Sequence, residues 1–238
     1  MFAFGQDRAP NVSIVCNIKS DQVYLGALLR EAISSNDERC TREALRNGAR
    51  ASGTYMGRPH SEPIIIAAAN RVTPGIIDAL FEARLDPHSD EVRRALLRIA
   101  GTGQELALER MLAAKVPVDL HGQDGETALG FAASAGTLHT LKLLLEKGAD
   151  VNATTETGLT PLMMVSDDRQ KIRELLKGGA KLDAVDRNGR SAIFFAVLNF
   201  QTNKLSILLE AGASPRLRDT RGDTPITLAR KLKRREEK

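Results

Sequence analysis

A short phrase that begins with glycine recurs four times in the second half of this chain of 238 residues. The phrases open at Gly125, Gly158, Gly189 and Gly222, so successive glycines are 33, 31 and 33 residues apart. A registered period of this length is the signature of a stacked repeat array. The pattern predicts one elongated unit in which each repeat contacts its neighbours.

Residues 123–154 show how one repeat is built. Thr127 is a natural cap for a first short helix, because its hydroxyl can satisfy free amides of the first turn. Gly136 ends this helix, and residues 138–147 form a second with Leu144 facing inward. Gly148 then follows where a helix ends in the left-handed conformation that glycine adopts at the lowest cost. Each repeat is therefore expected to be a helix pair.

The next repeat is shorter. Thr160 and Gly179 are separated by 19 residues, against 21 in the repeats on either side. Pro161 fits the first helical position, where its missing amide hydrogen has no partner. The deletion is expected at the junction of the two helices, where Asp167 and Asp168 are predicted to cap the second helix.

Together the phrases Gly-x-Thr-Pro-Leu-x-x-Ala and Leu-Leu-x-x-Gly-Ala-Asp-x-Asn resemble the ankyrin repeat, strongly over residues 123–229 and in diluted form over 22–121. The resemblance implies an all-α solenoid of stacked antiparallel helix pairs with β-turn fingers. The expected parts are an N-terminal extension (1–21), degenerate ankyrin-like repeats (22–121), three well-defined repeats (122–218) and a C-terminal capping repeat with a basic tail (219–238).

Partners of ankyrin proteins usually meet the finger tips and the exposed face of the first helices, and the resemblance carries this expectation to the matching positions here. On the fingers these are Gln123, Asp124, Glu126, Glu156, Thr157, Leu159, Arg187, Asn188, Arg190, Thr220, Arg221 and Asp223. On the helix face they are Ser134, Asp167, Asp168, Leu198 and Asn199. The edge runs acidic, acidic, basic and mixed, which would orient a partner.

Three phenylalanines cluster in the third of these repeats: Phe194, Phe195 and Phe200. Most of this cluster is expected to pack in the core or between repeats. Phe200 replaces the usual glycine between the helices, and its expected partial exposure makes it a candidate interface anchor.

Residues typical of catalysis or metal binding are sparse. The four histidines (His60, His88, His121 and His139) lack metal-ligand spacing. Cys40 is interpreted as a small residue on a helix face, since no motif frames it as a nucleophile. The sequence predicts no enzyme, no metal, no cofactor and no small-molecule substrate.

The net charge of +4 is concentrated at the C-terminal end, because residues 219–238 hold seven basic and four acidic residues. The basic run at 230–235 leaves open an association with nucleic acid or an anionic surface. The chain has no Trp and 4% aromatic residues, which disfavours a stacking platform for nucleic acid. A solvated capping helix is the preferred interpretation.

The two cysteines cannot form a disulfide framework, and neither a secretory leader nor a membrane-length apolar run is present. We therefore expect a cytoplasmic monomer with no membrane association. The leading hypothesis is a non-catalytic module that binds a protein partner of unknown identity through its concave face and finger tips. An inhibitor or immunity-type protein directed at one enzyme or toxin is the alternative that a free-standing repeat chain leaves open.

Overall fold

The computed structural model describes residues 22–53, Ala67 and residues 73–236, so the expected N-terminal extension at 1–21 lies outside the described residues. Within these ranges the backbone forms twelve helices and no strand. The helices are α1 (Gln22–Ser34), α2 (Glu38–Arg46), α4 (Pro74–Glu82), α5 (Asp90–Thr102), α6 (Glu105–Ala113), α7 (Ala128–Ser134), α8 (Leu138–Glu146), α9 (Pro161–Met164), α10 (Arg169–Lys177), α11 (Ala192–Leu198), α12 (Thr202–Glu210) and α13 (Pro225–Glu236).

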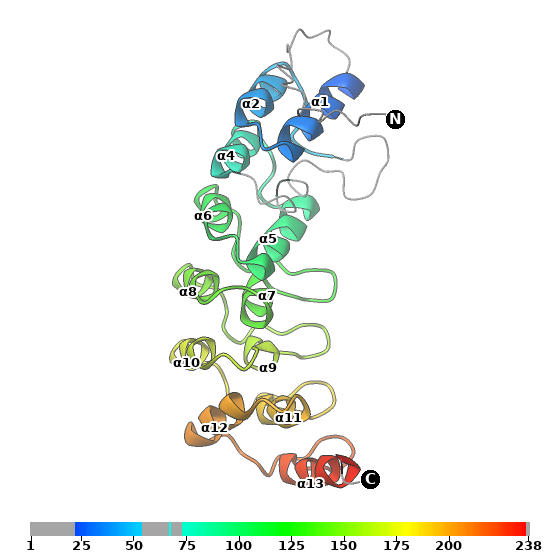
Figure 1. Ribbon diagram of the computed structural model, residues 1–238, viewed down its shortest axis with the longest axis vertical. Coiled ribbons are helices and arrows are strands. Elements are labelled where there is room, and N and C mark those ends of the chain that lie inside the picture. Colours follow the sequence, from blue (N-terminus) through cyan, green and yellow to red (C-terminus); the bar gives the residue numbers. More distant parts are fainter. Residues whose placement is uncertain (1–21, 54–66, 68–72, 237–238) are drawn as a thin grey trace, which may run out of the picture.

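The helices stack in two columns along the long axis of the molecule (Figure 1). One column holds α2, α4, α6, α8, α10 and α12, and the other holds α1, α5, α7, α9, α11 and α13. Helices that are neighbours within a column pack together, as α5 does with α7, α7 with α9, and α10 with α12. The all-α solenoid predicted from the repeats is confirmed.

Small and aliphatic side chains fill the space between the two columns. Ala132 and Ala133 on α7 are fully buried, as is Leu144 on α8. Gly130 brings α7 close to α9, because a Cβ atom at this position would lie 3.2 Å from the sulfur of Met164. The core is therefore continuous from one repeat to the next.

The predicted starts of α7 and α9 and the glycine after α8 are confirmed, and α8 ends one residue before the predicted end at 147. Thr127 is the N-cap of α7, and its hydroxyl oxygen accepts a hydrogen bond from the amide of Gly130 at 3.1 Å. Pro161 is the first residue of α9. Gly148 follows α8 with φ +87°, in the left-handed region that favours glycine.

The repeat at 155–185 is shorter because its first helix is shorter, whereas the sequence predicts the deletion at the junction between the two helices. Helix α9 has four residues, whereas α7 and α11 have seven each. Asp168 caps α10 as predicted, accepting hydrogen bonds from the amides of Gln170 (2.8 Å) and Lys171 (3.2 Å).

The prediction that Asp167 caps the same helix is wrong. Its carboxylate accepts a hydrogen bond from the amide of Lys204 at 2.7 Å, in the first turn of α12 in the following repeat. Helix α12 has no side-chain cap from its own N-cap residue, Gln201. Asp167 therefore supplies from one repeat the cap that the next repeat lacks.

Two buried lysines close the ends of first helices in the preceding repeat. The ammonium group of Lys204 donates to the carbonyl oxygens of Met163 and Val165, both at 2.9 Å, and that of Lys171 donates to Ala132 at 3.1 Å. Burial lowers the pKa of Lys204 to about 8, although the Asp167 carboxylate raises it. Both lysines link second helices to the first helices of another repeat.

Candidate partner-binding surface

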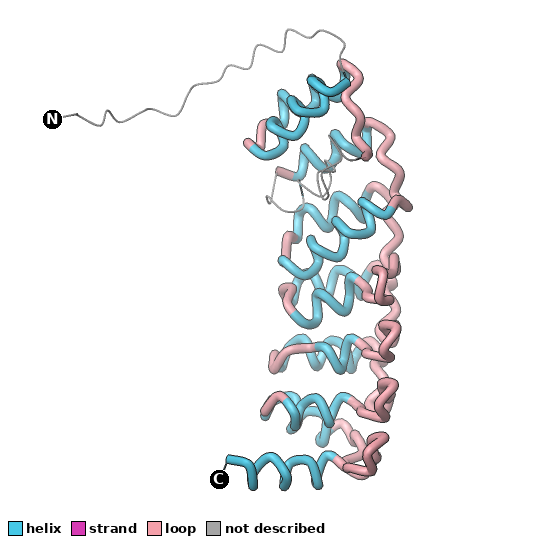
Figure 2. The backbone as a smooth tube through the Cα atoms, turned by 90° about the vertical axis from the view of Figure 1, so that its right-hand side faces the viewer, coloured by secondary structure: helices cyan, strands magenta, loops and turns pink. Residues whose placement is uncertain are grey.

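Four turns project from one side of the helix stack, where loop segments line one edge of the molecule (Figure 2). We call them finger 1 (residues 122–126), finger 2 (155–159), finger 3 (186–190) and finger 4 (219–223). Each closes on itself through a backbone hydrogen bond, as from the amide of Asp186 to the carbonyl of Arg190 at 3.0 Å. The recurring glycines have φ between +73° and +84°, which explains their period in the sequence.

Backbone hydrogen bonds also join each finger to the next. The amide of Glu156 donates to the carbonyl of Asp124 at 2.8 Å, and the amide of Arg187 donates to Thr157 at 3.0 Å. The third link, from Thr220 to Asn188, is 2.9 Å long. These bonds fix the spacing of the tips whatever side chains the tips carry.

Eight of the predicted partner-binding residues occupy the tips, and all eight are exposed. They are Gln123, Asp124, Glu156, Thr157, Arg187, Asn188, Thr220 and Arg221. Their charges follow the order negative, negative, positive, positive along the row. A row of this kind favours one orientation of a charged partner over the reverse.

The fourth finger is less mixed in charge than the sequence suggests. The ammonium group of Lys231 on α13 lies 2.6 and 2.7 Å from the two carboxylate oxygens of Asp223. Lys231 therefore balances the charge of Asp223, which is half-buried. The exposed charge at the tip of finger 4 is that of Arg221.

Glu126, Leu159 and Arg190, also predicted to bind a partner, are half-buried at the base of the fingers. The Glu126 carboxylate accepts a hydrogen bond from the amide of Asp124 at 3.0 Å. Arg190 forms an ion pair with the buried Asp186 at 2.6 Å, and its guanidinium lies 4.9 Å from the centre of the Phe195 ring. Burial raises the pKa of Asp186, but the hydrogen bonds from Arg190 outweigh it and lower the pKa overall. Glu126 and Arg190 shape the fingers.

The predicted helix-face residues are divided between two places. Leu198 is half-buried at the end of α11, with Asn199 exposed beside it, and Ser134 is half-buried at the end of α7. Asp167 and Asp168 lie beyond the last residue of α9, in the turn that leads to α10. The shortening of α9 moves this pair off the helix face, and both carboxylates cap helices.

Sequence reasoning missed a row of half-buried apolar side chains on the first helices. Phe131, Met164 and Phe195 occupy the same position in α7, α9 and α11, two residues after the buried Leu129, Leu162 and Ile193 respectively. The sequence did contain a signal for this row, since each of the three residues stands four positions after the N-cap of its helix. The row leaves part of its apolar surface exposed along the column of first helices.

Phe200 is confirmed as an exposed aromatic residue. Its side chain is 63% exposed, and its φ of +53° is left-handed. This backbone conformation is costly for a residue with a Cβ atom. Phe194 is buried and Phe195 half-buried, in agreement with the packing predicted for most of this cluster.

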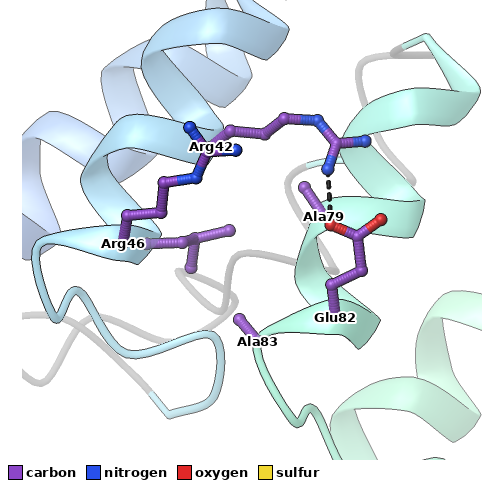
Figure 3. A pocket seen from close by; sticks show the side chains of 6 residues that line it. Arg42, Arg46, Ala79, Glu82 and Ala83 are labelled. Carbon is purple, nitrogen blue, oxygen red and sulfur yellow. Dashed lines mark hydrogen bonds and ion pairs between the residues drawn. The ribbon is translucent and has the colours of Figure 1, made fainter.

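A pocket of about 300 Å³ opens between α2 and α4, in the column that also holds α6, α8, α10 and α12. Arg42 reaches across from α2 to Glu82 on α4, and Arg46, Ala79 and Ala83 also line the space (Figure 3). Arg42 is also paired with Glu38 at 3.0 Å, so its charge is balanced on both sides. This pocket lies between two repeats, and the ion pair of Arg42 with Glu82 connects the helices on its two sides.

Within the described residues, no group of three or more histidine, cysteine or acidic side chains is arranged to hold a metal ion. Cys40 is buried on α2. The described helices also include none long and apolar enough to cross a membrane.

Comparison with known families agrees with this architecture. The family model for ankyrin repeats in three copies matches residues 64–155 and 96–177. Residues 64–177 of the chain therefore consist of ankyrin repeats. The repeats support a role as a protein–protein interaction module, in a family that is generally non-catalytic.

The chain is also similar in sequence to several curated proteins. Human neurogenic locus notch homolog protein 1 is 27% identical over 162 residues, which cover 66% of this chain and 6% of that protein. The mouse B-cell lymphoma 3 protein homolog is 29% identical over 126 residues, 52% of this chain and 28% of that protein. Human SH3 and multiple ankyrin repeat domains protein 1 is 36% identical over 95 residues, 38% of this chain and 4% of that protein. The chain thus spans less than a third of each relative's length.

Proposed function

We propose that this protein binds a protein partner through the finger tips and the adjoining face of the first helices. The carrying observation is the row of exposed tip residues, held at fixed spacing by backbone hydrogen bonds between successive fingers. A surface that is rigid before binding loses less conformational entropy on association. Its change of charge between fingers 2 and 3 favours one orientation of the partner.

The apolar row gives this surface a source of affinity besides charge. Phe131, Met164 and Phe195 are half-buried in the free chain, so a partner can cover the remaining apolar area. Aromatic side chains at the centre of an interface commonly dominate its binding energy. We propose that the tips orient the partner and that the apolar row holds it.

The test is affinity capture from a native extract with two variants of unchanged net charge. The tip variant carries Asp124→Arg, Glu156→Arg, Arg187→Glu and Arg221→Glu. The control carries Glu146→Arg and Arg173→Glu, two exposed positions on second helices. We expect a protein that the wild type and the control retain and the tip variant loses.

Circular dichroism must show that both variants remain folded. Equal capture by the wild type and the folded tip variant would contradict the finger surface as the binding site. Loss of the captured protein by the control alone would move the interface to the second helices.

A further inference from the structure

Three exposed guanidinium groups lie at fingers 3 and 4, on Arg187, on Arg221 and on Arg218, the residue before finger 4. None of the three forms an ion pair in the part of the chain that the structure describes. Arg218 donates to the carbonyl of Gly222 at 2.8 Å, which holds its guanidinium against finger 4. Arg187 and Arg221 lie on neighbouring tips, because the amide of Thr220 donates to the carbonyl of Asn188.

The carboxylates of these two fingers already have other partners. Asp186 is paired with Arg190 at 2.6 Å, and Asp223 with Lys231 at 2.6 Å. The Asp219 carboxylate accepts hydrogen bonds from the amides of Arg221 (3.0 Å) and Asp223 (2.8 Å). The positive charge of the exposed arginines is therefore available to an anionic partner.

We propose that fingers 3 and 4 bind a short acidic segment of the protein partner. This inference rests on the proposed function and names the chemistry of what binds at one end of the surface. Guanidinium groups bind carboxylates through paired, charge-assisted hydrogen bonds, a geometry that lysine cannot reproduce. Two neighbouring tips and the side of finger 4 offer such groups to successive carboxylates of one segment.

The neighbouring fingers favour a short polypeptide over nucleic acid. Asp124 on finger 1 and Glu156 on finger 2 are exposed, and they repel a polyanion that continues along the row. The exposed aromatic residues of the described chain, Tyr24 and Phe200, both lie outside the fingers. The fingers therefore lack the aromatic platform on which single-stranded bases stack.

The direct test measures the fluorescence anisotropy of a labelled hexaglutamate peptide titrated with the full chain. The titration is run at about 50 mM and about 200 mM salt, because screening of exposed charges increases over this range. A labelled oligothymidylate with the same number of negative charges is the comparison probe. The test variant is Arg187→Glu with Arg221→Glu. The control is Lys147→Glu with Arg173→Glu, which changes the net charge equally at exposed positions on or next to second helices.

We expect the test variant to weaken hexaglutamate binding by about tenfold or more, and the control by about twofold or less. The wild type should bind hexaglutamate more tightly than oligothymidylate. Equal losses in the two variants, or no binding by the wild type, would overturn the proposal. If oligothymidylate binds more tightly than hexaglutamate and its binding depends on the same arginines, the proposal is overturned and the ligand of this surface is nucleic acid.

Capture from a native extract separates this inference from the proposed function. The variant Asp124→Arg with Glu156→Arg alters only fingers 1 and 2, and the variant Arg187→Glu with Arg221→Glu only fingers 3 and 4. Loss of the partner by the second variant supports the acidic segment. Loss by the first alone keeps the finger surface and overturns the acidic segment, whereas loss by neither overturns both.

Discussion

Fingers 1 to 4 are joined to one another through backbone atoms, whereas the described repeats before residue 122 show links made by side chains. Arg42 on α2 pairs with Glu82 on α4, and Arg110 on α6 lies 3.7 Å from Asp78 on α4. The Asn36 side chain accepts a hydrogen bond from the amide of Thr73 at 2.7 Å. The later region adds backbone links between its fingers to the side-chain links that Asp167, Lys171 and Lys204 make between its repeats.

This difference explains why the repeat pattern is clear in one region and faint in the other. A backbone hydrogen bond such as that from Glu156 to Asp124 constrains the glycine beside it, since a Cβ atom on Gly125 would lie 2.8 Å from the Glu156 amide. The tip side chains are then free to vary. A side-chain link such as Arg42–Glu82 needs two particular residues, and it leaves no periodic trace.

The residues that end the second helices differ in the same way. After α8, α10 and α12 the left-handed position is occupied by Gly148, Gly179 and Gly212. After α4 and α6 it is occupied by Arg84 and Lys115, with φ of +63° and +62°. Residues with a Cβ atom adopt this conformation at a cost, so the ends of α4 and α6 carry strain that α8, α10 and α12 avoid, as does α2, which is followed by Gly48 with φ +95°.

The largest expected effect is on the shared core. Leu144→Ala removes a fully buried side chain between helices of the regular repeats, and it should lower the free energy of unfolding by about 2–5 kcal/mol. Urea denaturation followed by circular dichroism measures the change. Leu209→Ala, at a position 45% exposed, is the control and should cost far less. Equal losses would show that the core assigned to α8 does not stabilise the stack.

Raising the pH should stabilise the fold around Lys204, because deprotonation removes the cost of burying its charge. Because its pKa falls from 10.5 to about 8 on folding, the unfolded chain binds more protons between these values. The free energy of unfolding of the wild type should therefore rise, relative to Lys204→Met, by about 3 kcal/mol from pH 8 to pH 10.5. This gain is absent below pH 8. A pH-independent difference between the two proteins would contradict the lowered pKa.

At pH 7 the same substitution tests the hydrogen bonds of the buried ammonium group. Lys204→Met keeps the length of the side chain but leaves the carbonyls of Met163 and Val165 without this donor. The expected loss of stability is about 1–3 kcal/mol. Lys147→Met, at an exposed position, should leave stability nearly unchanged. A stabilised Lys204→Met protein would show that burying the charge costs more than its hydrogen bonds contribute.

Replacing the left-handed residues of the earlier repeats by glycine should remove their strain. Arg84→Gly and Lys115→Gly are each expected to raise the free energy of unfolding by about 0.5–1 kcal/mol, with the larger freedom of glycine in the unfolded chain limiting the gain. Thermal unfolding measures both. Gly148→Ala is the reverse change and should be destabilising, and the same sign for all three substitutions would contradict the comparison.

The smallest effect is expected from the surface ion pair between α2 and α4. Arg42→Ala removes the contacts with Glu38 and Glu82, and such partly exposed pairs contribute less than about 1 kcal/mol each. Denaturation at low and high salt measures the contribution, which should shrink as salt screens the charges. A salt-independent loss would show that packing of the arginine stem, rather than charge, connects these repeats.

Much of the fold and the position of the finger tips could be predicted from the sequence. The glycine period, the Thr127 cap and Pro161 are local signals, since each acts on the backbone within a few residues. The inward roles of Glu126 and Arg190 could not be predicted in this way. They depend on where a turn directs each side chain after it has folded.

The buried lysines show the same limit more sharply. Lysine is ordinarily a solvated residue, and nothing near Lys171 or Lys204 in the sequence marks either as buried. Their hydrogen-bond partners lie 35 to 41 positions earlier in the chain. Only the stacking of one repeat on another brings these groups together.

The sequence by itself determined the repeat period, the helix pairs and the glycine turns, because these follow from backbone conformations that nearby residues favour. The tertiary structure alone decided which charges are exposed and which are balanced. Arg187 and Arg190 are three residues apart, yet Arg187 is exposed at a finger tip without an ion pair to any described residue, whereas Arg190 is paired with the buried Asp186. Electrostatic balance depends on distances in space, and those distances are set when the repeats stack.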